Sequence, residues 1–356
     1  MNLAGCKSEL TSFLESKNSS KLEAAVLPDF FLDRLISLDW EAPEFSKLIQ
    51  DVVNRKGGSI DGVSQLHING GNAINVASAL SALGVKATPI VCTSEFGLNK
   101  IQFYLKGAVD TSHIKICGKS SITTAMEFRK GTEKVNVMLR DLGGLANFGP
   151  KDLTENDYSL IENVDYVCLF NWAGTLYFGT ELAQEVFGRA KNTTYFDTAD
   201  PTPNLKEISG LMDKVLRSNQ VDILSLNENE AATYAGMLDK TLMERKGRGV
   251  SAELALESAR VLAKNLSARI DLHTTEFSAT ITKKGETVVP AFKIHVQRAT
   301  GAGDAWNAGN ILGDGNHLST ECRLLLANAV SACYLSSKDG KHPTKKQLAQ
   351  FLKNNA

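Results

Sequence analysis

The chain has 356 residues, which is enough for one large α/β domain or two ordinary domains. Its 39 Lys and Arg residues nearly balance its 40 Asp and Glu residues, so a protein that neutralises many nucleic-acid phosphates is not expected. No apolar run reaches the ~18 residues of a membrane span, and the N-terminal stretch lacks the apolar core of a signal peptide. We therefore expect a cytoplasmic protein with neither a nucleic acid nor a membrane as its partner.

The cysteines predict buried free thiols rather than a metal site. None of them forms a C-x-x-C pair, which is the spacing of a common type of zinc site. Most lie in apolar runs such as YVCLF and SACYL, as expected for free thiols in a reducing compartment. The six residues are Cys6, Cys92, Cys117, Cys168, Cys322 and Cys333.

The N-terminal part predicts a helix, a strand and a second helix. The first helix is expected over about 8–25, and the apolar run AAVLPDFFLDRLISL predicts one buried strand that ends near Asp33 or just beyond. Apolar residues at helical spacing in EFSKLIQDVVNRK predict a short helix, which Gly57 and Gly58 end.

A strand, a glycine turn and a helix are predicted in QLHINGGNAINVASALSALG, residues 65–84. A further strand, ATPIVCT, and a helix, EFGLNKIQFYLKGA, follow. The stretches SSITTAMEF and EKVNVMLR are rich in β-branched residues and are separated by a turn, which predicts a hairpin. Because this hairpin interrupts a βα alternation, we place it outside the main sheet as a small lid.

Beyond residue 150 strands and helices alternate regularly, which predicts a parallel sheet covered on both faces. The strands are YVCLFN, TTYFD, VDILSLN and RIDLHT, and helices are expected near 179–190, 204–217, 228–237 and 251–266. A second hairpin near 277–294 and three helices, starting near 304, 319 and 344, complete the chain. Such sheets bind ligands at the carboxyl ends of their strands. Polar residues fall at these ends: Asn171, Asp197, Asn227, His273 and the 300–304 turn.

The sequence ATGAGDAWNAG, residues 299–309, predicts an anion site at the start of a helix. Gly301 and Gly303 let the backbone approach a phosphate, and the helix N-terminus directs N–H groups and partial positive charge at it. A carboxylate beside such a site would suit a general base that takes a proton from an attacking hydroxyl, and Asp304 has this position. The alternative is a tight turn in which Asp304 caps the helix.

Two further motifs follow predicted strands. In INGGNAINVA, residues 68–77, Asn72 and Asn75 offer amides that suit a polyhydroxylated ligand, although Asn72 is also an ordinary helix cap. In LSLNENEAA, residues 224–232, Asn227 and Glu230 could hold the water shell of Mg²⁺ beside phosphates. An acidic residue in a first helical turn also stabilises the helix dipole without any ligand.

These three motifs resemble those of one family. GGNAINVA is similar to the N-terminal glycine signature of the PfkB (ribokinase-like) carbohydrate kinases, NENE to their N-x-x-E motif, and TGAGD to their C-terminal signature. The resemblance covers about residue 25 to the end, and TGAGD followed by a helix of small residues is its most specific part. The longer segment before the glycine signature resembles that of long archaeal-type members.

The resemblance implies a three-layer α/β/α, Rossmann-like domain over 26–356, after a helical extension over 1–25. Its small β lid would comprise about 38–69 and 113–140. It also implies transfer of the terminal phosphoryl group of ATP or ADP, with Mg²⁺, to a hydroxyl of a sugar, sugar phosphate or nucleoside.

The resemblance assigns roles to residues of this chain. Asp304 is the base, and Gly301, Ala302 and Gly303 form the anion hole. Asn227 and Glu230 organise Mg²⁺ and phosphate through water. The substrate-side residues are Asp33, Gly71, Asn72 and Asn75, and Asn328 borders the nucleotide base.

The chain departs from the family in two places. Relatives usually have a glycine turn, T-x-G-x-x-G, where this chain reads DLHTTEFS, so His273, Thr274 and Thr275 would contact the nucleotide differently. Arg298 replaces an Asp that relatives often carry, which weakens any inference of a monovalent-cation site.

The acceptor stays open between several classes. Asn171 and Arg140 are candidates to contact it. Arg140 in the cleft would favour a sugar phosphate such as ribose 1-phosphate, although solvated lid surface is the simpler explanation of Arg140. Asp197 and Asp200 could approach the phosphates through Mg²⁺. The alternatives are a nucleoside kinase and a non-catalytic sugar- or nucleotide-binding regulator. An edge strand of the lid is a candidate for pairing with a second subunit.

Overall fold

The computed structural model describes residues 3–16, 21–131, 133–247, 249–297, 300–337 and 340–355. Its central sheet comprises β1 Glu23–Leu27, β4 Lys86–Pro89, β9 Tyr166–Phe170, β10 Thr193–Asp197, β11 Ile223–Asn227, β12 Arg269–His273, β13 Phe277–Thr282 and β14 Gly285–Pro290. Within the described ranges these eight strands have the order β14-β13-β12-β11-β10-β9-β1-β4. All neighbours from β4 to β12 pair in parallel, and β13 and β14 extend the sheet as an antiparallel hairpin.

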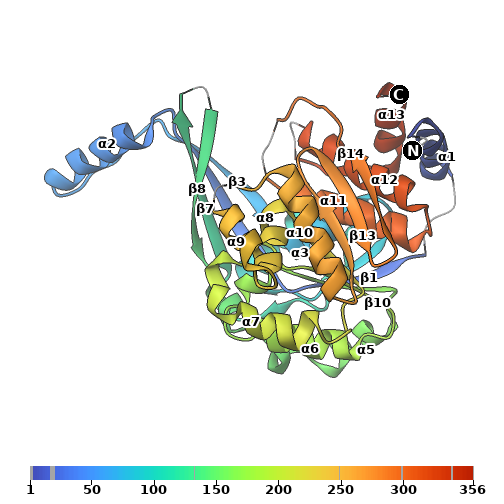
Figure 1. The fold of residues 1–356 in the computed structure, drawn as a ribbon. Coiled ribbons are helices and arrows are strands. Elements are labelled where there is room, and N and C mark those ends of the chain that lie inside the picture. The colour runs from blue at the N-terminus through green and yellow to red at the C-terminus, as the bar shows by residue number, and fades with distance from the viewer. Residues whose placement is uncertain are drawn as a thin grey trace.

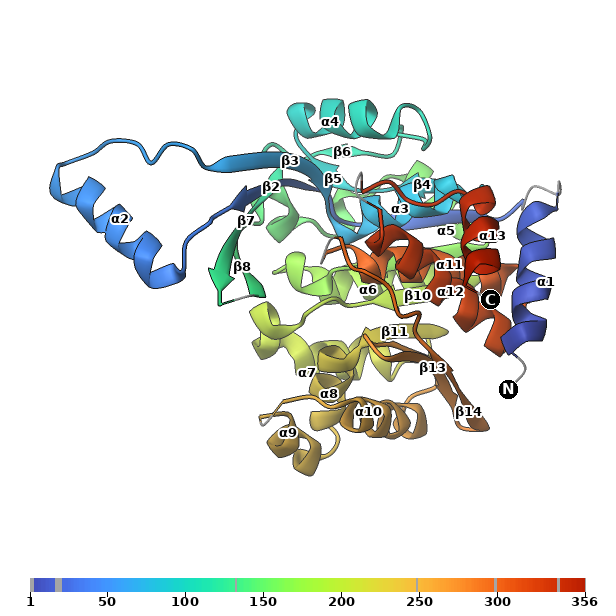
Figure 2. The ribbon, with the colours of Figure 1, turned by 90° about the horizontal axis from the view of Figure 1, so that it is seen from above.

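Helices cover both faces of this sheet (Figures 1 and 2). One face carries α5 Glu155–Asn163, α6 Gly179–Arg189, α7 Ile208–Leu211, α8 Glu228–Gly236, α9 Lys240–Lys246 and α10 Ala252–Asn265. The other carries α1 Leu3–Glu15, α3 Asn72–Ala82, α4 Glu95–Leu105, α11 Ala302–Gly315, α12 Thr320–Leu335 and α13 Lys345–Asn354. Alternate residues of β9 enter the two hydrophobic cores, Val167 and Leu169 on one side and Cys168 and Phe170 on the other. The strand is apolar throughout because both of its faces are buried.

A second sheet lies beside the carboxyl ends of the central strands. It contains β2 Phe31–Ser37, β3 Ser64–Gly70, β7 Ser121–Lys130 and β8 Glu133–Asp141, in the order β3-β2-β7-β8. Helix α2, Ala42–Asn54, projects from it, away from the rest of the molecule, and has no buried residue (Figures 1 and 2). The predicted hairpin is confirmed as β7 and β8, outside the main sheet. A short parallel pair, β5 Cys92–Thr93 and β6 Lys115–Ile116, completes the strands of the described residues.

The predicted strand over 24–38 is wrong, because the chain breaks at Pro28. Residues 23–27 pair with β4 and β9 in the central sheet, whereas residues 31–37 cross to the second sheet and pair with β3 and β7. Pro28 has no N–H to donate to a ladder, which makes it a natural end for a central strand. Asp33 therefore lies in the middle of β2 rather than at the end of the first strand.

Several predicted helix boundaries also change. The first helix spans 3–15 rather than 8–25, and residues 23–27 are strand. The helix expected near 204–217 is interrupted: a 3-10 turn, Thr202–Glu207, precedes α7, and a π-helical turn, Met212–Leu216, follows it. The helices predicted near 179–190, 228–237 and 251–266 are confirmed as α6, α8 and α10.

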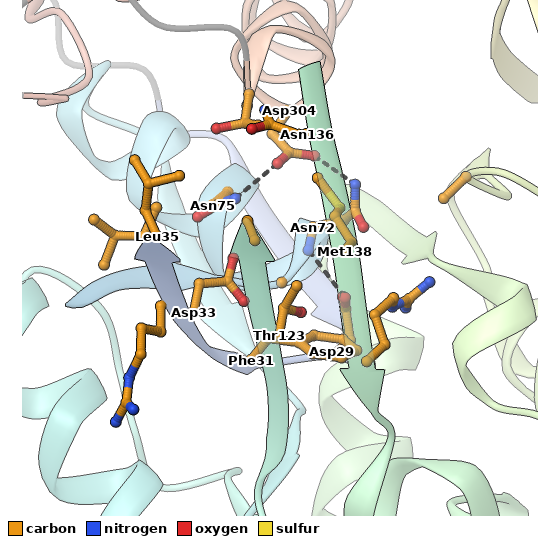
Figure 3. A pocket seen from close by; sticks show the side chains of 18 of the residues that line it. Asp29, Phe31, Asp33, Leu35, Asn72, Asn75, Thr123, Asn136, Met138 and Asp304 are labelled. Carbon is orange, nitrogen blue, oxygen red and sulfur yellow. Dashed lines mark hydrogen bonds between the residues drawn. The ribbon is translucent and has the colours of Figure 1, made fainter. Parts of the chain in front are cut away.

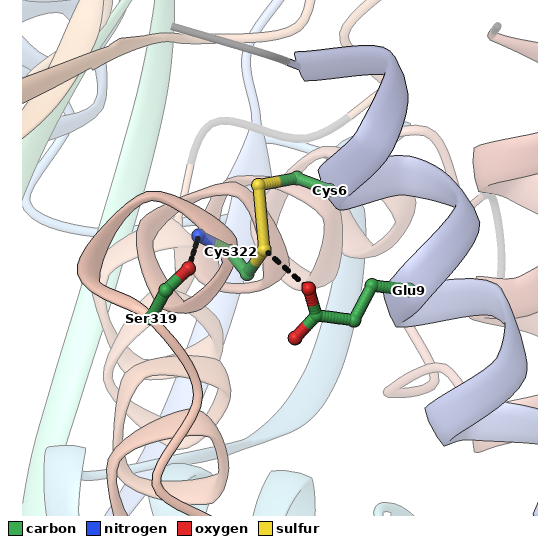
Figure 4. Close-up of a disulfide and its surroundings, with 4 residues drawn as sticks. All are labelled: Cys6, Glu9, Ser319 and Cys322. Carbon is green, nitrogen blue, oxygen red and sulfur yellow. Dashed lines mark hydrogen bonds between the residues drawn. A yellow bond between two sulfur atoms is a disulfide. The ribbon is translucent and has the colours of Figure 1, made fainter.

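The N-terminal helix is attached to the body by a disulfide. Cys6 of α1 and Cys322 of α12 are bonded, with their Cα atoms 5.1 Å apart, and Glu9 Oε2 lies 3.5 Å from the Cys322 sulfur (Figure 4). The prediction that all six cysteines are free is therefore wrong for this pair, because residues 316 positions apart meet where α1 packs on α12. Leu10 and Leu14, which follow Cys6 at intervals of four residues and so share its face of α1, are also buried. None of the helices in the described ranges is long and apolar enough to cross a membrane.

Candidate active site

The turn before α11 separates two cavities. Gly301 has φ +84°, a left-handed conformation that favours glycine, and a Cβ there would lie 2.7 Å from the Tyr334 hydroxyl oxygen. Gly301 and Asp304 line a cavity of about 410 Å³ beneath the second sheet. Ala302 and Gly303 line another of about 680 Å³. Because the first N–H groups of a helix have no intrahelical acceptor, this turn can offer donors to an anion between the cavities.

The carboxylate of Asp304 is held by two amides. Asn72 Nδ2 donates to its Oδ1 and Asn75 Nδ2 to its Oδ2, each at 2.8 Å, and both Asn residues belong to α3 (Figure 3). Burial raises the pKa of Asp304 to about 7, and the bonds from Asn75 and Asn72 oppose that rise. A carboxylate with a pKa near neutrality is suited to accept a proton. The motif that contains Asn72 and Asn75 and the motif that contains Asp304 are far apart in the sequence, but they meet at the Asp304 carboxyl group.

Asp29, which the sequence analysis missed, fixes the start of α3. It is fully buried and accepts hydrogen bonds from the backbone N–H groups of Asn72 and Ala73, at 3.0 and 2.8 Å. The amide of Asn171 also donates to it, at 2.8 Å. Asp29 therefore caps α3, and Asn72 is left to reach Asp304. Asp29 follows the end of a buried strand, where a candidate residue is expected, but the strand predicted over 24–38 placed Asp29 inside it.

The first cavity gathers all the predicted substrate-side residues. Burial raises the pKa of Asp33 to about 6, and its Oδ1 is buried without a hydrogen-bond partner among the described residues. The guanidinium of Arg140 lies 5.1 Å from the centre of the Phe31 ring and lines the cavity, rather than only the solvated surface of the lid. The predicted residues of this wall are Asp33, Gly71, Asn72, Asn75, Arg140, Asn171, Gly301 and Asp304.

Strand alternation in the second sheet supplies cavity residues that the sequence analysis did not name. Thr123 of β7 and Asn136 and Met138 of β8 line the cavity, as do Leu66 and Ile68 of β3. Adjacent residues of a strand point to opposite faces, so these positions could have been found once the hairpin was placed over the site.

The second cavity is lined by four of the five predicted nucleotide-binding residues, His273, Thr274, Thr275 and Asn328, and by Ala302 and Gly303 of the predicted anion hole. Not all of them present free polar groups. The Asn328 side chain accepts from Trp306 Nε1 at 2.9 Å and donates to the Pro290 carbonyl at 3.1 Å. The Thr274 hydroxyl accepts from Phe277 N–H at 3.0 Å within its own turn. Asn328 and Thr274 therefore shape this cavity by supporting its wall.

Asn227 and Glu230 line neither cavity. They form a reciprocal cap of α8, in which Asn227 Oδ1 accepts from Glu230 N–H at 3.0 Å and Glu230 Oε2 accepts from Asn227 N–H at 2.8 Å. Burial, and then the charge of Asp197, raises the pKa of Glu230 well above its usual range. Without any ligand, Glu230 therefore supports the start of α8, as the helix-dipole alternative for this motif expects, and it does so through a cap that was not predicted.

The described residues contain no group of three His, Cys, Asp or Glu side chains placed to hold a metal ion. Mg²⁺ usually keeps several waters and is bound by one or two carboxylates and by substrate phosphates. The charge of Asp197 acts on Glu230, but neither side chain lines either cavity, and both oxygens of Glu230 accept hydrogen bonds from Asn227. Arg298, the residue that bears on a monovalent-cation site, lies outside the described residues.

Solved structures of similar fold are kinases at low sequence identity. Ribokinase of Arabidopsis thaliana, complexed with ribose and ATP, has a TM-score of 0.71 at 17% identity, over 94% of this chain and 99% of that chain. Adenosine kinase of Sinorhizobium meliloti gives 0.70 at 16% identity, over 95% and 100%. The nucleoside kinase of Methanocaldococcus jannaschii gives 0.67 at 14% identity, over 95% and 100%. These similarities show the ribokinase-like fold. No curated protein matches the chain.

The family follows from the sequence. The model of the pfkB family carbohydrate kinases matches residues 46–347, which is most of the chain and includes all three motifs. The match agrees with the three-layer fold and with the carboxylate at the start of α11. The chain therefore belongs to the pfkB family of carbohydrate kinases, phosphotransferases that act on an alcohol group.

Proposed function

We propose that this protein transfers the terminal phosphoryl group of ATP or ADP to a hydroxyl of a sugar or sugar phosphate, with Asp304 as general base. The observation that carries the proposal is that Asp304 lines the first cavity while Ala302 and Gly303, its neighbours in the same turn, line the second, and each cavity has a size suited to a small ligand. The acceptor would occupy the cavity lined by Asp33 and Arg140, and the nucleotide the cavity lined by Ala302 and Gly303.

The residues around Asp304 support this mechanism. The acceptor hydroxyl would give its proton to an oxygen of Asp304 as the hydroxyl oxygen attacks phosphorus. The amides of Asn72 and Asn75 hold both carboxylate oxygens and so fix their direction. The N–H groups at the start of α11 would stabilise the charge that grows on the transferred group. Mg²⁺, when bound, would neutralise phosphate charge, and Glu230 would interact with it through water.

The lining of the acceptor cavity bears on the choice of acceptor. Asp33 offers an unpartnered oxygen to a hydroxyl group, and Arg140 offers the charge that a phosphate would need. Ribose 1-phosphate is therefore our candidate acceptor. The apolar side chains of Phe31, Leu66 and Met138 in the same cavity favour a nucleoside as the second candidate.

The second sheet would act as the lid of this kinase domain. We propose that it closes over the acceptor and keeps water, a competing acceptor, away from the phosphoryl group. The lid would begin at Phe31 instead of residue 38, because β2 belongs to the second sheet. The N-terminal helix would form an extension before the kinase domain, and a cytoplasmic location stays a prediction.

An acceptor screen tests the proposed function. Sugars, sugar phosphates and nucleosides are each incubated with ATP or with ADP and Mg²⁺, and nucleotide turnover is followed against reactions without acceptor. We expect acceptor-dependent turnover, with a sugar phosphate preferred and Arg140→Ala raising the KM for it alone. Binding of these ligands without turnover of any would instead support a non-catalytic regulator, and preference for a nucleoside would support the second candidate.

A further inference from the structure

The imidazole of His273 lines the second cavity beside Gly303, in the turn that begins α11. His273 ends β12 and pairs in register with Asn227, the last residue of β11. Its Nε2 lies 3.9 Å from Asp197 Oδ2, which is too far for a hydrogen bond. The Nε2 atom is buried and has no hydrogen-bond partner among the described residues. A buried polar atom without a partner is rare and costly, so a missing ligand is a reasonable explanation.

The ring of His273 is fixed against the anion-binding turn. It stacks on the indole of Trp306, with ring centres 5.0 Å apart and planes inclined by 33°. A Cβ at Gly303 would lie 3.3 Å from His273 Cε1 and 4.0 Å from Nε2. The imidazole therefore lies directly beside the backbone of Gly303, and Trp306, two residues after Asp304, limits its rotation.

The acceptor facing this nitrogen, Asp197 Oδ2 at 3.9 Å, is already hydrogen-bonded to another group. The carboxylate of Asp197 already accepts from Asn307 Nδ2 at 2.6 Å and from Ala199 N–H at 3.0 Å. The hydroxyl of Thr274 is bonded within its own turn, so the segment after β12 offers few side-chain donors to a phosphate. His273 is the side chain of this segment that has a donor position open beside Gly303.

We propose that His273 is a catalytic residue of this kinase, whose Nε2–H donates a hydrogen bond to an oxygen of the phosphoryl group during transfer. The proposal rests on the function proposed above. The proton of the acceptor hydroxyl goes to Asp304, the phosphorus–oxygen bond to the leaving nucleotide breaks, and His273 keeps its own proton. The imidazole thus adds a donor to those of the 301–303 turn, at the place where charge develops.

Two substitutions of His273 test its N–H donor and its aromatic ring separately. His273→Phe keeps an aromatic ring against Trp306 but has no N–H, whereas His273→Gln loses the ring and keeps an N–H donor of similar reach. With saturating nucleotide and acceptor, we expect the Phe variant to lose on the order of 10²–10³ in kcat, as for removal of one transition-state donor. We expect the Gln variant to stay within about tenfold of the wild type. The KM for nucleotide should change much less than kcat in both.

The wild type and Asp304→Asn, measured beside these variants, separate this proposal from the proposed function. Absence of turnover in the wild type with every acceptor would overturn both. Turnover in the wild type, with the Phe variant as active as the Gln variant or more so, would overturn the role of His273 alone. Melting temperatures of both variants within a few degrees of the wild type would show that the comparison concerns folded proteins.

Discussion

The Asp304 carboxyl lies in a setting that raises its pKa, and this predicts a pH dependence. Burial raises the pKa to about 7. A general base works only when it is deprotonated, so kcat should fall roughly tenfold for each pH unit below ~7 and level off above it. Steady-state kinetics from pH 5 to pH 9 with saturating substrates would measure this profile. A rate that stays constant down to pH 5, in protein shown by circular dichroism to be folded, would contradict the assignment.

Asp29 is expected to be a structural residue of the site. Replacing it with Ala leaves the N–H groups of Asn72 and Ala73 and the Asn171 amide without their acceptor. We expect a loss of roughly 2–4 kcal/mol in the free energy of unfolding, measured by urea denaturation. Asp29→Asn, which keeps one acceptor oxygen, should lose less. Equal stability of the Ala variant and the wild type would show that the cap does not matter.

At the residue level, motifs predicted the site better than separate residues did. Asp304, Asn72 and Asn75 could be named because each lies at a fixed distance after a glycine-containing turn, in the first turns of a helix, and the structure brings them into direct contact. Asn227 and Glu230 were named from a motif too, yet a sequence cannot tell whether a carboxylate binds a ligand or its own helix cap. Asp29 was missed because its role depends on a strand break.

The N-terminal helix α1 is an element whose attachment can be tested. With Cys6 and Cys322 bonded, the unreduced and denatured protein should show four reactive thiols, and the reduced protein six. Cys6→Ser should lower the free energy of unfolding by roughly 2–4 kcal/mol, because the bond closes a long loop in the unfolded chain. A reductant should lower the melting temperature of the wild type but not that of Cys6→Ser. Six reactive thiols before reduction would disprove the bond.

Predictions of elements succeeded where periodicity was long and regular. Apart from the interrupted helix near 204–217, the predicted strands and helices beyond residue 150 and the hairpin of β7 and β8 have the predicted type and place. The strand over 24–38 failed because the apolar pattern continues across Pro28 although the pairing partners change there. The partners of a strand are set by segments far away in the sequence, which local patterns do not reveal. The bond between Cys6 and Cys322 could not be predicted for the same reason.

In the whole molecule, the second sheet, which we propose as the lid, has an exposed apolar outer face. Val135, Val137 and Leu139 of β8 are between 42% and 57% exposed, on the face opposite to Asn136 and Met138 of the cavity. In the described sheet β8 is also an edge strand. Exposed edges and apolar patches commonly mark contacts between chains.

We therefore predict that the protein forms a homodimer through the lid, as light scattering after size-exclusion chromatography would show. Val137→Lys, which places a charge on the outer face, should shift it toward the monomer, whereas a charge on the exposed α13 residue Gln350 should not. A monomeric wild type at micromolar concentration would contradict this prediction.

The carboxylate of Asp304, which lines the first cavity next to the turn that lines the second, is the centre of the proposed chemistry, and Asp304→Asn tests its role most directly. The substitution keeps the size of the side chain and one acceptor oxygen for the amides of Asn72 and Asn75. Calorimetric titration with nucleotide and with the acceptor found in the screen should give affinities within a few-fold of the wild type, while kcat falls on the order of 10²–10⁴. A variant that binds both ligands and keeps the kcat of the wild type would contradict the account.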